Sequence, residues 1–111
     1  MKLPFELKQK DVVLTSGMEA EIQARAERLD HFFDRIMRCR VTVEGPGGHH
    51  RQGLYRVNID LTVPGAEIFV HKQADANLEL ALKSAFDAAA RRLEDHVRKS
   101  RGFVKDHRSE P

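Results

Sequence analysis

Two basic pairs near the end of the chain are spaced as a helix that binds phosphates would need. Arg91-Arg92 and Arg98-Lys99 lie seven residues apart in a stretch, residues 77–100, whose pattern predicts one long helix. Seven residues are close to two helical turns, so the pairs form two short columns of positive charge spaced by about 10 Å. Such columns suit a phosphate backbone better than a small anion. The same residues could also be an ordinary solvated helix face.

A second basic flank is expected on an earlier helix. Thr15-Ser16, followed by Glu19, resembles the start of a capped helix. The apolar residues that follow keep to one stripe, which predicts a helix reaching residue 36 (Met18, Ile22, Leu29, Phe33 and Ile36). At about 100° per residue, three arginines share one flank with a single acid, and four acids fall on the other side (Arg25, Arg28 and Arg35 with Glu21; Glu19, Glu27, Asp30 and Asp34).

The remaining elements are strands. Alternation of apolar and polar residues predicts strands over residues 5–8, 40–44, 55–63 and 67–71, with a turn at Pro64-Gly65. The order strand, helix, three strands, helix predicts an α+β two-layer sandwich, in which both helices pack on one face of a four-stranded, mainly antiparallel sheet. We expect a single domain over residues 1–105 and a flexible tail over 106–111.

Composition limits the class of protein. The 111 residues carry a net charge of +2, but residues 91–108 hold seven Lys or Arg against three acids, which favours an anionic partner. Cys39 is the single cysteine, so no internal disulfide can form, and we interpret it as an ordinary small residue at the start of a strand. We expect no signal peptide and no apolar run that could span a membrane, which indicates a cytoplasmic protein.

No motif indicates catalysis. The glycines of residues 45–48 lack the lysine of a phosphate loop, and no Ser/His/Asp or Cys/His arrangement has a recognisable spacing. His49-His50 and His71 could bind a metal, but exposed loop histidines explain them more simply. We therefore expect no enzyme, no cofactor, no metal and no small-molecule substrate.

The ordered segments resemble the ribosome hibernation promoting factor / ribosome-associated inhibitor family, once called sigma-54 modulation proteins. The likeness runs from about residue 3 to 105. Three segments carry it: Leu14-Thr15 with Ile22, Arg25, Arg28-Leu29-Asp30 and Phe33; Tyr55–Val63 with Pro64-Gly65; and Ala81-Leu82, Ala85-Phe86-Asp87 and Arg91-Arg92-Leu93. Some positions depart from the family pattern, namely Asn77 for a usual Asp, Glu79 for an aromatic residue, Arg92 for Gln, and Ala88 where some members carry Lys.

The resemblance implies a function without catalysis. Members of that family bind the small ribosomal subunit in the channel of messenger and transfer RNA, and they keep ribosomes idle under stress or in stationary phase. Because the chain stops at Pro111, we expect a short-form member that is monomeric when free. Its partner would be the small subunit and its ribosomal RNA.

The candidate RNA-binding residues come from both helices. Five positions match the family pattern, and three more join on charge and helix position (Arg25, Arg28, Arg91, Arg98 and Lys99; Arg35, Lys83 and Arg92). If the two helices pack side by side, these residues could form one continuous positive surface. The alternative is a protein–protein regulatory module that uses the sheet and binds no RNA.

Overall fold

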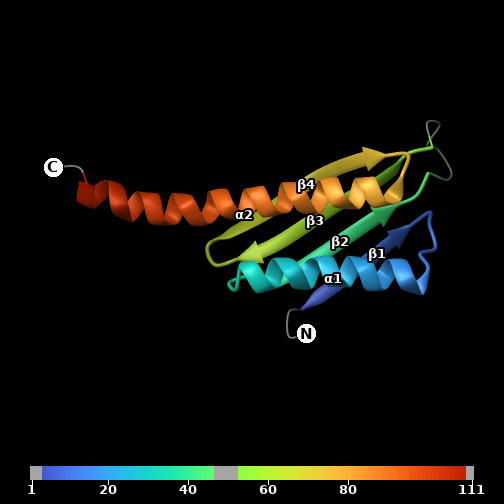
Figure 1. Ribbon diagram of the computed structural model, residues 1–111, viewed down its shortest axis with the longest axis horizontal. Helices are drawn as coiled ribbons and strands as arrows, with labels where there is room; N and C mark the ends of the chain where they lie inside the picture. The colour runs from blue at the N-terminus through green and yellow to red at the C-terminus, as the bar shows by residue number, and fades with distance from the viewer. Residues whose placement is uncertain (1–3, 47–52, 110–111) are drawn as a thin grey trace.

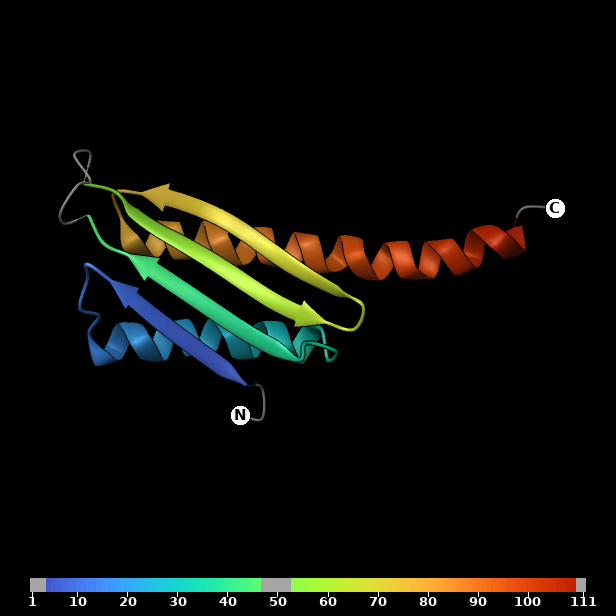
Figure 2. The same ribbon diagram turned by 180° about the vertical axis from the view of Figure 1, so that it is seen from behind.

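The computed structural model describes residues 4–46 and 53–109, and its elements follow one another in the predicted order. They are β1 (Phe5–Lys10), α1 (Ser16–Phe32), β2 (Arg38–Glu44), β3 (Tyr55–Val63), β4 (Ala66–Asp75) and α2 (Leu78–Ser109). Figures 1 and 2 show both helices on the same face of one sheet, with the other face open. The α+β two-layer sandwich is confirmed.

The sheet has the strand order β1-β2-β3-β4, so β1 and β4 are its edges. β2 pairs antiparallel with β3, and β3 pairs antiparallel with β4. β1 and β2 pair in parallel, because α1 carries the chain from the end of β1 back to the start of β2. The mainly antiparallel sheet is confirmed, with this one parallel pair.

The hairpin of β3 and β4 matches its prediction most closely. β3 has the predicted bounds, and its alternate residues Val57, Ile59 and Leu61 are fully buried. The turn that follows contains Gly65 at φ 80°, in the left-handed region that suits glycine. β4 is longer than expected, and a bulge shifts the register between Val57 and Ile59.

The core lies between the sheet and the helices. α1 lies beside β1 and β2, whereas α2 lies over β3 and β4 (Figure 1). Each helix buries one stripe against the inner sheet face (Ile22, Ala26 and Leu29 from α1; Ala81, Leu82, Ala85, Phe86, Ala89 and Leu93 from α2). Leaving these side chains in water would cost about 1.5–3 kcal/mol for each large one, so the buried stripes fix how both helices face the sheet.

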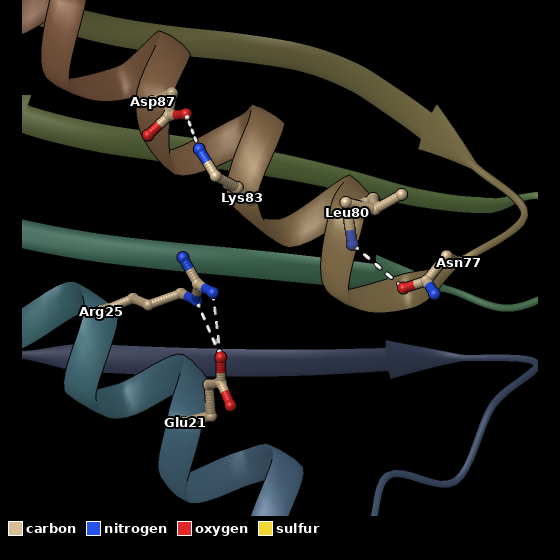
Figure 3. Close-up of polar contacts among 6 residues, drawn as sticks. All are labelled: Glu21, Arg25, Asn77, Leu80, Lys83 and Asp87. Atoms are coloured by element: carbon tan, nitrogen blue, oxygen red, sulfur yellow. Dashed lines mark hydrogen bonds and ion pairs between the residues drawn. The ribbon is translucent and has the colours of Figure 1, made fainter.

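Side-chain caps start both helices where the sequence indicated. The Thr15 hydroxyl accepts a hydrogen bond from the Met18 N–H at 3.1 Å. The Asn77 Oδ1 accepts from the Leu80 N–H at 3.2 Å (Figure 3). Each cap satisfies a backbone donor that the first helical turn leaves without a partner.

The ends of both helices differ from the prediction. α1 stops at Phe32 instead of residue 36, and the Phe33 N–H donates to the Leu29 carbonyl at 2.8 Å. A longer helix would leave only one residue to reverse the chain before β2. Ile36 is still buried, but it reaches the core from the connecting loop.

α2 continues to Ser109 instead of ending near residue 100, and it extends past the end of the sheet (Figure 1). It therefore includes residues 106–109, where we expected a flexible tail. A single glycine at 102 costs a helix about 1 kcal/mol, which is too little to end it. The domain boundary at residue 105 stays a prediction. Within the described ranges, no helix combines the length and the apolar character that crossing a membrane requires.

Candidate nucleic-acid interface

A groove of about 470 Å³ lies between the edge strand β4 and α2. Three of the predicted site residues line it together: Arg91, Arg92 and Arg98. The other lining residues come from β4 and from the same helix (Val70, His71, Ala88, Glu94 and Asp95). Three guanidinium groups against two carboxylates leave an excess of positive charge at this site.

Arg92 has a structural contact that its charge alone did not indicate. Its Nη1 donates a hydrogen bond to the backbone carbonyl of Phe69 at 3.2 Å. Phe69 lies on the edge strand β4, where outward carbonyls have no neighbouring strand to pair with. Arg92 therefore covers part of the sheet edge and ties α2 to it. Only the tertiary structure brings these residues, 23 positions apart, into contact.

Arg91 and Arg98 lie about two helical turns apart, and both are exposed. Arg98 Nη1 lies 3.4 Å from the Oδ1 of Asp95, three residues earlier on the same helix. The two side chains of that pair are 71% and 60% exposed, so the pair is weak and easily exchanged for another anion. Arg91 has no ion-pair partner among the described residues.

The sides of α1 and α2 that face each other carry neutralised charges. Arg25 Nη2 lies 2.9 Å from Glu21 Oε2, and Lys83 Nζ lies 3.0 Å from Asp87 Oδ2. Figure 3 shows Arg25 extending from α1 toward α2, where Lys83 and Asp87 pair. Both pairs follow the i,i+4 spacing, which places the partners on one helix face. With Arg98 and Asp95, three of the eight predicted residues thus pair with an acid of their own helix.

Three further predicted residues are exposed: Arg28, Arg35 and Lys99. Within the part of the chain that the structure describes, none of them has an ion-pair partner. Arg28 lies on α1, but Arg35 lies in the loop after α1, so its predicted position on a helical flank is wrong. The candidate residues therefore do not share one continuous helix-borne surface, and their RNA-binding role stays a prediction.

Sequence reasoning did not include two residues, His71 and Phe32, among the candidates for RNA binding. His71 lines the groove beside the three arginines, and its ring packs edge-on against Phe69 with the centroids 4.4 Å apart. Phe32 is 70% exposed at the end of α1. The spacing from Arg28 to Phe32 is a signal that could have placed them on one flank, but spacing alone could not show that Phe32 is exposed.

Cys39 and the histidines offer little chemistry. Burial, with a smaller contribution from the Asp60 charge, raises the pKa of the Cys39 thiol to about 12, which suits a core residue and not a nucleophile. Across residues 4–46 and 53–109, no three His, Cys, Asp or Glu side chains gather as a metal site would require. His49-His50 lie outside the described residues.

This chain resembles a curated relative in sequence and solved structures in fold. The ribosome hibernation promotion factor of Deinococcus radiodurans is 28% identical over 89 residues, which cover 80% of this chain and 46% of that protein. The chain thus spans about half the length of this relative.

Solved structures share the fold of this chain. Two of them are the crystal structure of the Protein Y N-terminal domain from Thermus thermophilus, and a ribosomal subunit interface protein from Coxiella burnetii. The first has a TM-score of 0.70 at 20% identity and covers 85% of this chain and 98% of its own. The second has a TM-score of 0.73 at 10% identity and covers 85% and 97%.

The family model described as Sigma 54 modulation protein / S30EA ribosomal protein matches residues 5–101, which include every element of the sheet and most of α2. This match confirms the resemblance drawn from the three sequence segments. The chain belongs to the Sigma 54 modulation protein / S30EA ribosomal protein family.

Proposed function

We propose that this protein binds ribosomal RNA of the small ribosomal subunit, in the channel used by messenger and transfer RNA, and keeps ribosomes idle under stress or in stationary phase. The names of its relatives, a ribosome hibernation promotion factor and a ribosomal subunit interface protein, support a ribosomal partner. The protein would act in the cytoplasm as a monomer and would catalyse no reaction.

One observation carries the RNA contact: the groove in which Arg91, Arg92 and Arg98 lie together beside β4. Phosphates are bound mainly through charge, and RNA helices are read mostly by their shape and backbone. Arg91 has no partner among the described residues, and Arg98 has only its exposed pair with Asp95. Both side chains can turn to a phosphate at little cost in free energy, because an exposed ion pair contributes little to stability.

The open face of the sheet is a less suitable site for a partner. Some of its polar side chains already link neighbouring strands: Arg40 Nε lies 3.0 Å from Glu6 Oε1. The Thr62 hydroxyl donates to Glu67 Oε2 at 2.7 Å. A partner binding there would have to break these contacts, which favours the helix side over a regulatory module that uses the sheet.

Sedimentation with purified small subunits tests the proposal. At low salt the protein should sediment with the subunits, and raising the salt should release it steeply, because binding phosphates displaces counterions. Subunits already filled with messenger RNA and initiator transfer RNA should bind much less protein. Absence from the subunit pellet at low salt would refute RNA binding, and equal binding to filled subunits would refute the channel.

A further inference from the structure

Phe32 is an exposed aromatic residue that the core does not need. It is the last residue of α1, and 70% of its surface is accessible. The apolar residues on either side take the core positions instead: Leu29 and Ile36 are buried, and Phe33 packs against the core. Met37, in the loop that follows, is also 56% exposed, so this end of α1 has two large apolar side chains in water.

Phe32 lies on the same flank of α1 as Arg28, which has no ion-pair partner among the residues that the structure describes. Four residues separate them, so they are about 40° apart around the helix and about 6 Å apart along its axis. That axial distance is comparable to the distance from the base of a nucleotide to its phosphate. Arg25, one turn before Arg28, is paired with Glu21, which leaves Arg28 as the cation nearest to Phe32 on this flank.

The end of a helix favours an uncharged contact. Its carbonyls carry about half a negative charge, which repels a phosphate at the last turn. A nucleobase has no such charge, and its flat face fits an exposed ring. The rings of His31 and Phe32 form a T-shaped pair, with centroids 5.3 Å apart and planes at 75°, and 70% of the Phe32 surface stays accessible to a partner.

We infer that Phe32 stacks on an unpaired nucleobase of RNA while Arg28 contacts a phosphate of the same strand. The base must be unpaired, because a base inside a duplex has its faces covered by its neighbours. Stacking of this kind tolerates any base, since every base has a π-face. The inference rests on the proposed function, and it adds single-stranded or loop RNA to the shape contacts of the groove beside β4.

Substitutions at Phe32 separate stacking from simple apolar contact. Phe32→Tyr should bind small subunits about as tightly as the unchanged protein, whereas Phe32→Leu and Phe32→Ala should each weaken binding about tenfold. Leucine keeps the apolar volume but has no ring, so a contact with a ribosomal protein would tolerate it. Because Phe32 is exposed, all three variants should keep the thermal midpoint within a few degrees.

A single fluorescent reporter gives an independent measurement. The chain has no tryptophan, so Phe32→Trp introduces the only one. If it is supplied as 5-hydroxytryptophan, it can be excited without exciting the tryptophans of ribosomal proteins. Stacking on a base should quench its emission when small subunits are added. Val13→Trp is the matched control, because Val13 is 92% exposed and lies before α1, at the other end of that helix.

The outcomes distinguish this inference from the proposed function. Quenching at position 32 but not at 13, together with weak binding by the leucine variant, supports stacking. A Phe32→Leu variant that binds as tightly as the unchanged protein, or bound protein whose reporter at 32 is not quenched, overturns the stacking and leaves the subunit binding intact. Failure of the unchanged protein to bind subunits overturns both.

Discussion

The two sides of α2 differ in how their basic residues are paired with acids. On the side toward α1, Lys83 pairs with Asp87, and Arg25 pairs with Glu21 across from it (Figure 3). On the side toward β4, Arg91, Arg92 and Arg98 gather in a groove, where their acidic contact is one exposed pair with Asp95. Both basic residues on the first side are thus paired with acids, whereas on the second Arg91 has no ion-pair partner within the described residues and Arg92 donates to a backbone carbonyl.

The difference shows that counting basic residues overstates the charge a helix offers to a partner. An acid four residues away on the same face neutralises a cation before any ligand arrives. The side chain of Arg25 is only 20% exposed, so burial also holds it in place. We therefore expect the groove beside β4 to dominate binding and the paired residues Arg25 and Lys83 to contribute little.

The largest expected effect on binding follows from reversing the charge of the groove. Arg91→Glu/Arg98→Glu should weaken binding to small subunits by at least about 100-fold, because each phosphate contact contributes about 1.5 kcal/mol. The salt dependence of the binding constant should become shallower as well. Binding is measured by sedimentation over a series of salt concentrations.

The matched control for that variant is Lys8→Glu/Lys10→Glu. It changes the net charge equally, but on two exposed residues of β1. It should weaken binding only a few-fold. Equal losses in the two variants would mean that net charge, and not the groove, determines affinity. A large drop in the thermal midpoint of the first variant would instead make Arg91 and Arg98 structural.

A smaller effect in the opposite direction should follow from removing the acids between the helices. Glu21→Gln/Asp87→Asn releases Arg25 and Lys83 from their pairs. We expect binding about fivefold tighter and a steeper salt dependence, because two cations become available to phosphates. Unchanged affinity would show that Arg25 and Lys83 lie away from the RNA.

Asp11→Asn/Glu27→Gln is the control for this gain. It removes the same amount of negative charge from two exposed residues, one in the loop after β1 and one on α1 away from Glu21. It should change binding less than twofold. The asparagine is compatible with the φ of 54° at position 11.

The smallest effect separates the neighbours Arg91 and Arg92. Arg92→Gln should lower the free energy of unfolding by about 1 kcal/mol, because the Phe69 carbonyl loses its donor. Arg91→Gln should leave it unchanged. Labelling of the Cys39 thiol during denaturant unfolding measures this, because that thiol is buried in the folded protein. Equal stability of both variants would mean that Arg92 does not secure the edge of the sheet.

The sequence predicted the parts of the fold that follow from local patterns. The strict alternation of Tyr55–Val63 gave the correct bounds of β3, and Thr15 and Asn77 marked the two helix starts. The end of α1 was wrong for a physical reason. Phe33 and Ile36 continue the helical stripe because they belong to the core, but they reach it from a loop.

The site was less predictable, because the state of a charge depends on its neighbours in space. The i,i+4 pair of Arg25 with Glu21 could be read from spacing. The contact of Arg92 with Phe69, and the groove that joins Arg91 and Arg98 to His71, depend on how α2 packs against β4. No local pattern encodes that packing.

Chemical probing of ribosomal RNA in small subunits, with and without the protein, tests RNA binding in the channel most directly. We predict protection of nucleotides that line the channel of messenger and transfer RNA, and loss of that protection with Arg91→Glu/Arg98→Glu. Protection only at nucleotides outside the channel, or none at a protein concentration that saturates the subunits, would contradict it.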